Sequence, residues 1–128
     1  MGRWWCLAVL LGVGAMPMAA LAENADDALA AYDETFLGAT LTDACNPGFD
    51  WSTSKRHDGE VAQRAYDALL VKVHEVDPGG NNDEGKASMA LELRSRKLLR
   101  QGKAMVAAKG CGDPEIRRRL HDFAASAH

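Results

Sequence analysis

The stretch GEVAQRAYDALLVKVHEV, residues 59–76, carries the strongest amphipathic pattern in the chain. Its apolar side chains recur every three to four residues, which is the spacing of one face of an α-helix. We therefore expect a helix here, capped by Ser54 or Asp58, that packs against other helices. The predicted buried face consists of Ala62, Ala65, Tyr66, Leu69, Val73 and Val76.

The segment DPGGNN, residues 77–82, follows and cannot continue a helix. A third helix is predicted beyond it, over about Asp83 to Lys109, with Gly110 as its C-terminal stop. Ser95 and Gly102 are small, so a neighbouring helix is expected to approach closely at these positions. The predicted buried stripe consists of Ala87, Leu91, Ser95, Leu98, Gly102 and Met105.

The sequence Asp113-Pro114-Glu115 predicts the start of a fourth helix. The aspartate is a favoured N-cap, proline suits the first helical position, and an acid is favoured by the helix dipole in the first turn. The predicted inner face consists of Ile116, Leu120, Phe123, Ala124 and Ala127.

Upstream of residue 59, a first helix is predicted over about Asn24 to Phe36, and Gly38 is expected to end it. A linker then runs from Gly38 to about Asp58, with Phe49 and Trp51 placed to cover the core from outside. The predicted buried stripe of the first helix consists of Ala25, Ala28, Leu29, Tyr32 and Phe36.

The first 22 residues have the pattern of a secretory signal peptide. Arg3 supplies a positive start, residues 4–18 form an apolar run, and Ala20-Leu21-Ala22 matches the small-x-small cleavage pattern. We expect cleavage after Ala22 and a bacterial periplasmic or secreted protein whose single domain spans residues 23–128. The alternative is a retained membrane anchor, because about 19 uncharged residues approach the length of a span.

Removal of Cys6 with the signal peptide leaves Cys45 and Cys111. Two cysteines in an exported chain predict a disulfide, and one that closes this loop stabilises a fold by roughly 4 kcal/mol. If the second and third predicted helices are antiparallel, both cysteines lie at the same end. The sequence thus predicts an all-α fold, a small antiparallel bundle of about four helices linked by Cys45–Cys111.

Charge is distributed unevenly along the chain. The whole chain has 15 basic and 18 acidic residues and a net charge of −3, which disfavours nucleic-acid binding. Acids dominate residues 23–59 and bases dominate residues 86–119. This contrast has two explanations: neutralisation within the fold, or a docking face for an acidic protein, a lipid headgroup or an anionic wall polymer. The candidate basic face consists of Arg94, Arg96, Lys97, Arg100, Lys103, Arg117, Arg118 and Arg119.

The sequence gives no sign of a metal or haem site. No two of the four histidines have metal-ligand helical spacing, and the haem attachment motif C-x-x-C-H is absent. We expect no metal and no cofactor. The histidines, interpreted as solvated surface residues, are His57, His74, His121 and His128.

Residue types that are used in catalysis are close together in the sequence only at the end of the predicted linker. Ser52 and Ser54 stand near His57, between Asp50 and Asp58. Catalytic triads are defined by geometry rather than by sequence proximity, and no G-x-S-x-G motif occurs. We interpret this stretch as a polar linker and expect no catalytic residue.

Three functions remain open. The first is a non-enzymatic binding protein of the bacterial envelope, of the inhibitor or immunity type, that acts by surface contact. The second is a periplasmic stress chaperone. The third, ranked last, is an enzyme directed at the cell wall through Asp50, His57 or Asp58.

Overall fold

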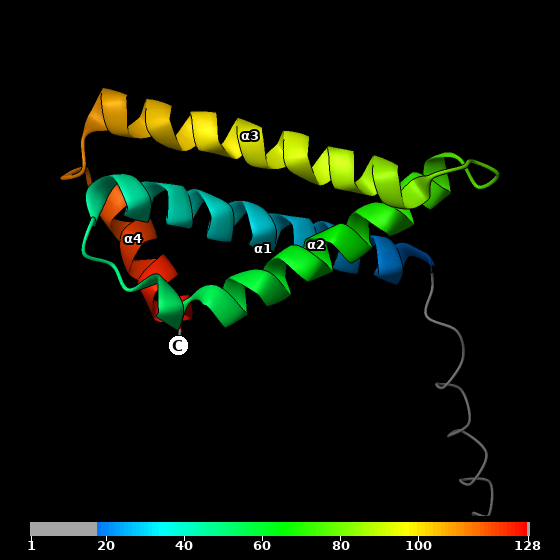
Figure 1. Ribbon diagram of the computed structural model, residues 1–128, viewed down its shortest axis with the longest axis horizontal. Coiled ribbons are helices and arrows are strands. Elements are labelled where there is room, and N and C mark those ends of the chain that lie inside the picture. Colours follow the sequence, from blue (N-terminus) through cyan, green and yellow to red (C-terminus); the bar gives the residue numbers. More distant parts are fainter. Residues whose placement is uncertain (1–17, 128) are drawn as a thin grey trace, which may run out of the picture.

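The computed structural model describes residues 18–127, with residues 18–23 described by their backbone alone (Figure 1). This part of the chain is all-α and has no strand. α1 contacts each of the other three helices, and α2 runs antiparallel to both α1 and α3 (Figure 1). The predicted helical bundle is therefore confirmed. Its elements are α1 (Met18–Cys45), the 3₁₀ turn η1 (Trp51–Thr53), α2 (Lys55–Val76), α3 (Asp83–Lys109) and α4 (Pro114–Ser126).

Local capping chemistry explains both ends of α3 and the start of α4. The Asn82 side chain accepts a hydrogen bond from the backbone N–H of Gly85 at 3.3 Å, at the start of α3. Gly110 ends α3 with φ of 77°, a conformation that favours glycine. Asp113 caps α4 as predicted, because its carboxylate accepts from the backbone N–H of Glu115 and Ile116 at 3.0 and 3.2 Å.

The predicted end of the first helix near Gly38 is wrong. α1 continues to Cys45, and the predicted linker shortens to residues 46–54. The reason is tertiary, since a Cβ at Gly38 would lie 2.9 Å from the Phe123 Cβ of α4. The glycine thus lets α4 approach α1, and the extended part of α1 buries Leu37 and Leu41. Burial outweighs the weak helix propensity of one glycine, which costs about 1 kcal/mol.

The predicted signal peptide falls mostly outside the described residues. Residues 1–17, which include Cys6 and all but the last residue of the apolar run, are not described. Residues 18–22 form the first part of α1, so the predicted cleavage site after Ala22 lies within this helix. His128 is also outside the described part of the chain.

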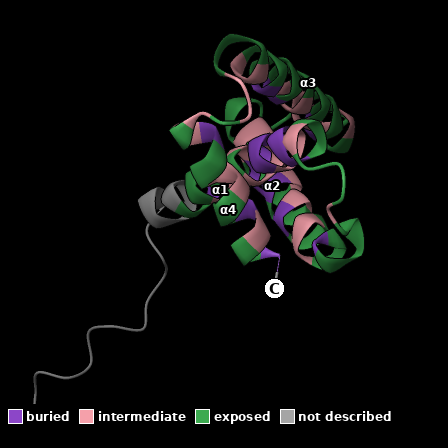
Figure 2. Ribbon diagram, turned by 90° about the vertical axis from the view of Figure 1, so that its left-hand side faces the viewer, coloured by how far each residue is buried: buried purple, intermediate pink, exposed green. Residues whose placement is uncertain are grey.

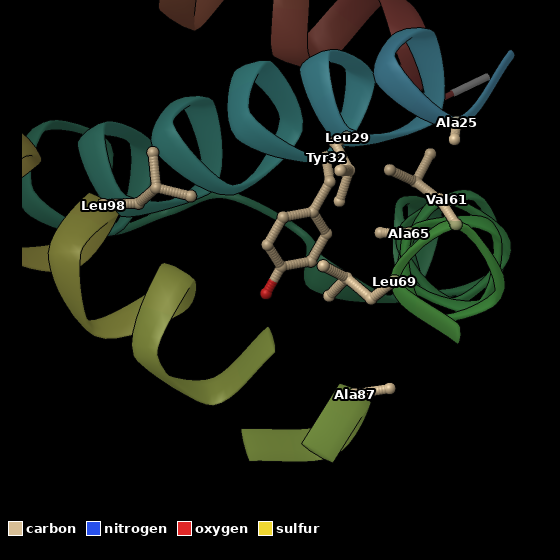
Figure 3. Close-up of a cluster of buried hydrophobic side chains, with 9 residues drawn as sticks. Ala25, Leu29, Tyr32, Val61, Ala65, Leu69, Ala87 and Leu98 are labelled. Carbon is tan, nitrogen blue, oxygen red and sulfur yellow. The ribbon is translucent and has the colours of Figure 1, made fainter. Parts of the chain in front are cut away.

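The larger hydrophobic core lies between α1, α2 and α3 (Figure 3). Tyr32 of α1 points into the space between α2 and α3, toward Leu69 (Figure 3). Burial raises the pKa of Tyr32, and a hydrogen bond with the Ser95 hydroxyl partly opposes that shift. The buried members are Ala25, Leu29, Tyr32, Val61, Ala65, Ala68, Leu69, Ala87 and Leu98.

The predicted face of α2 is partly wrong. Ala65 and Leu69 are buried as predicted, but Val76 is 86% exposed. Val76 is the last residue of α2, where the chain leaves the bundle for the connector to α3. Val61 and Ala68 are buried in its place.

The second core lies at the end of the bundle where α1 and α3 both finish (Figure 1). Its buried side chains are Leu37, Leu41 and Ile116. The predicted disulfide joins Cys45 to Cys111 there, with the two Cα atoms 5.5 Å apart. Cys45 is the last residue of α1 rather than part of a linker.

α3 approaches α1 closely at the predicted small residue Gly102. A Cβ built there would lie 2.6 Å from the Thr40 Cγ2. The buried residues of the molecule face the space between the helices, whereas the outward side of α3 is largely exposed (Figure 2). α3 therefore covers the core with one side and presents the other to solvent.

Candidate functional site: the basic residues of α3 and α4

Arg94, one of the predicted basic residues, forms an ion pair between two helices. Its Nε and Nη2 donate to the two carboxylate oxygens of Asp33 at 2.6 and 2.7 Å, so that α3 is joined to α1. The hydrogen bond with Asp33 raises the pKa of Arg94, so the guanidinium stays charged. A two-point contact of this kind orients both side chains. Arg94 therefore links the helix pair through two of its guanidinium nitrogens.

Arg119 also forms ion pairs within the fold. Its Nη1 donates to Glu34 of α1 at 3.0 Å, and its Nη2 lies 3.6 Å from Glu115 one turn earlier. Only 16% of the Arg119 side chain is exposed. Together with Lys72–Asp26, these pairs connect acids of α1 to bases of α2, α3 and α4. They agree with the interpretation that charge is neutralised within the fold.

Two further candidates form ion pairs within their own helices. Arg96 pairs with Glu92 one turn earlier on α3, and Arg118 lies 3.8 Å from Asp122 on α4. These pairs are exposed and contribute little to stability. In the described part of the chain, the predicted basic residues that form no ion pair are Lys97, Arg100, Lys103 and Arg117.

The unpaired bases of α3 lie beside exposed apolar side chains on the outer side of that helix. Met89 and Leu93 are each 56% exposed, and they line a shallow hollow with Ala90. Spacings of three and four residues place the next bases on the same side of the helix. We call this surface the outer α3 stripe, and it consists of Met89, Leu93, Lys97, Arg100 and Lys103.

The polar cluster at the end of the linker is used for capping. The Asp50 carboxylate accepts from the Ser52 backbone N–H at 3.1 Å and from the Ser52 hydroxyl at 2.6 Å, which holds the η1 turn. The hydrogen bond from that hydroxyl lowers the pKa of Asp50. His57 instead lines a hollow between α2 and α4 to which neither Asp50 nor Asp58 contributes. The structure therefore does not assemble these side chains into one site.

Residues 18–127 contain no group of three or more histidine, cysteine, aspartate or glutamate side chains placed to hold a metal ion. Within the same range, none of the helices combines the length and the apolar character needed to cross a bilayer.

Two clefts that flank α4 were not predicted from the sequence. One, of about 320 Å³, separates α2 from α4 and includes His57, Arg64 and Arg119 among its lining residues. The other, of about 340 Å³, lies beside the disulfide and is lined by residues from α1, the following loop and α4. Each cleft combines residues that are distant in sequence, so no local pattern indicates it. The only indication in the sequence was the prediction that Phe49 and Trp51 cover the core from outside. In the structure, the centroids of their rings lie 5.5 and 6.0 Å from the ring centroid of Phe123 on α4.

Comparison with known proteins identifies no relative of this chain: no family model, no curated protein and no solved structure matches it.

Proposed function

We propose that this chain is a non-enzymatic binding protein of the bacterial envelope that contacts an acidic protein partner through the outer α3 stripe. The observation that supports this proposal is the combination of unpaired cations with exposed Met89 and Leu93 on one side of α3. Methionine and arginine are enriched in protein interfaces, and desolvated arginines are frequent hot spots. An acidic partner with an apolar centre would complement both parts of the stripe.

The inner side of α3 favours recognition by a rigid surface. Arg94–Asp33, the close approach at Gly102 and the disulfide beyond its last turn hold α3 against α1. A helix fixed in this way loses little conformational freedom when a partner binds its outer side. The disulfide is also compatible with the oxidising environment that an exported protein meets in the bacterial envelope.

The test is a comparison of captures from envelope extract of the producing bacterium. The stripe variant carries Lys97→Glu, Arg100→Glu and Lys103→Glu, and the matched control carries Lys55→Glu, Arg56→Glu and Arg64→Glu on α2. We expect the wild-type chain and the control to recover the same acidic protein, and the stripe variant to lose it. Recovery should fall as salt is raised, because exposed charges are screened.

Two results would count against the proposal. One is equal recovery by the stripe variant and the control. The other is a set of captured proteins that does not differ from that of an unrelated acidic bait.

A chaperone remains the second candidate, and one observation favours it. Met89 and Leu93 expose apolar surface that would bind unfolded segments without charge recognition. In that case the chain suppresses aggregation of a client protein at low pH, and Met89→Ser with Leu93→Ser abolishes the effect. Val76→Ser is the matched control, since Val76 is 86% exposed but lies outside the stripe. Absence of protection by the wild-type chain excludes this function.

A further inference from the structure

The cleft beside the disulfide has the dimensions of a small-molecule site. Its volume of about 340 Å³ falls near the lower end of the range for such sites, which is about 300–1,000 Å³. The last turn of α1 and Asn46 form one side, Phe49 of the following loop forms the second, and α4 forms the third. The cleft is anchored covalently, because Cys45 of the disulfide is part of its lining.

The charge of this cleft is one-sided. Arg117 and His121 lie one turn apart on α4, so both side chains project from the same face into the cleft lining. No carboxylate is among the lining residues. The neighbouring Arg118 and Arg119 are paired with acids elsewhere, whereas Arg117 forms no ion pair with any described residue. An anionic ligand in the cleft would therefore pair with Arg117 without competition from a carboxylate of the cleft lining.

Part of the polar backbone at the end of α1 is already engaged in hydrogen bonds. A helix C-terminus disfavours anions when its carbonyl oxygens are free. Here the Thr42 carbonyl oxygen accepts the backbone N–H of Asn46 at 2.8 Å. The Thr42 hydroxyl is also engaged, since it donates to the Gly38 carbonyl oxygen at 2.7 Å.

The other lining side chains of the cleft include an apolar group. Phe49 packs edge-on against Trp51, with ring centroids 5.0 Å apart, and its ring lies 5.5 Å from that of the buried Phe123. Leu120 and Ala124 continue this apolar surface along α4. Aromatic contacts of this geometry hold the Phe49 ring in place, so it provides apolar surface for a ligand.

We propose that this cleft binds a small organic anion, with its carboxylate at Arg117 and His121 and its apolar body against Phe49 and Leu120. The combination of one unpaired arginine, one histidine and an aromatic wall matches both parts of such a ligand. The site lies on α4 and the α1 end, so it is separate from the outer α3 stripe and does not depend on the function proposed for that stripe.

The test is isothermal titration calorimetry of the full chain with 3-phenylpropionate, its uncharged amide and inorganic phosphate. We expect 3-phenylpropionate to bind with a dissociation constant of about 1 mM, an ordinary affinity for a ligand of this size. The amide should bind about tenfold more weakly, because it lacks the charge that strengthens the hydrogen bonds to Arg117. Phosphate should also bind more weakly, since it has no apolar body.

Variants on adjacent positions of α4 localise the binding. Arg117→Gln should weaken binding of 3-phenylpropionate by about tenfold, and Arg117→Lys should retain part of the affinity. Arg118→Gln is the matched control, because Arg118 does not line the cleft, and it should bind as the wild-type chain does. Both residues are exposed, and equal thermal unfolding midpoints will show that the fold is intact.

Three outcomes overturn the proposal. The first is no detectable binding of 3-phenylpropionate. The second is equal affinity for 3-phenylpropionate and for either the amide or phosphate, which would show that the charge or the apolar body of the ligand does not contribute to binding. The third is an equal loss in the Arg117→Gln and Arg118→Gln variants, which places the binding outside this cleft.

Discussion

The two ends of the bundle are held together by different means. At the end near the connector between α2 and α3, three helices share a core in which small alanines allow close helix packing around Tyr32. At the other end α2 and α3 diverge, and the shorter α4 packs on α1 (Figure 1). The buried cluster there consists of Leu37, Leu41 and Ile116, with the buried Phe123 of α4 packed on Gly38, and the disulfide lies beside it. The comparison indicates that a covalent bond supports the end where the apolar core is small.

The largest effect is expected from removal of the disulfide. Its two cysteines are separated by 66 residues, and a loop of this length corresponds to about 4 kcal/mol on the chain-entropy model. Replacement of Cys45 and Cys111 by serine should therefore lower the free energy of unfolding by about that amount. Urea denaturation of the oxidised protein and of this double variant measures the change.

The same variant tests whether the bond acts locally. Amide hydrogen exchange should accelerate most in α4 and in the last turns of α1 and α3, while the alanine-rich core end is affected less. A uniform acceleration across all four helices would show that the two ends do not differ in the way proposed. A change in unfolding free energy below about 1 kcal/mol would show that the small core is sufficient by itself.

Most of the helices could be predicted because their signals are local. The cap Asp113, the proline at the next position and the stop at Gly110 need only neighbouring residues, and α3 and α4 have the predicted bounds within a residue or two. The end of α1 could not be predicted in this way. By sequence, Gly38 resembles a residue that ends a helix. The helix continues through it because Phe123, which belongs to a helix far along the chain, packs on Gly38.

The sequence indicates which basic residues are candidates for the site, but it does not indicate which of them form ion pairs within the fold. The sequence identifies a basic segment, and the unpaired residues Lys97, Arg100 and Lys103 do lie on the outer side of α3. It cannot distinguish them from Arg94 and Arg119, which face acids of α1, because that distinction depends on which helices touch. The clefts beside α4 were missed for the same reason.

A pair of glycine substitutions tests the close packing at the disulfide end. Gly38→Ala should lower stability by about 1–2 kcal/mol, because the overlap with Phe123 outweighs the gain in helix propensity. Gly59→Ala in α2 is the matched control, since the added methyl group meets no other part of the molecule within 4 Å beyond the adjoining residues and backbone of its own helix. It should raise stability by about 0.5–1 kcal/mol. Thermal and urea unfolding measure both changes, and an equal increase in both variants would mean that α4 does not require this close approach.

The smallest effects concern the ion pairs that join α1 to its neighbours. Asp33–Arg94 crosses to α3 through two hydrogen bonds, and both side chains are about one-third exposed, at 35% and 34%. Glu34–Arg119 crosses to α4 through one hydrogen bond, and the Glu34 side chain is 68% exposed. Double-mutant cycles should give a coupling energy of about 1 kcal/mol for the first pair and about half of that or less for the second.

These cycles use Asp33→Asn with Arg94→Gln, and Glu34→Gln with Arg119→Gln. The ranking follows from geometry, since a bidentate contact with less exposure to water loses less of its Coulomb energy to solvent. Raising the salt concentration to about 1 M should reduce the coupling of Glu34–Arg119 more, because screening acts most strongly on exposed charges. A larger coupling for Glu34–Arg119 would contradict the comparison of the two ends. It would mean that charge, and not only the disulfide, compensates for the small core beneath α4.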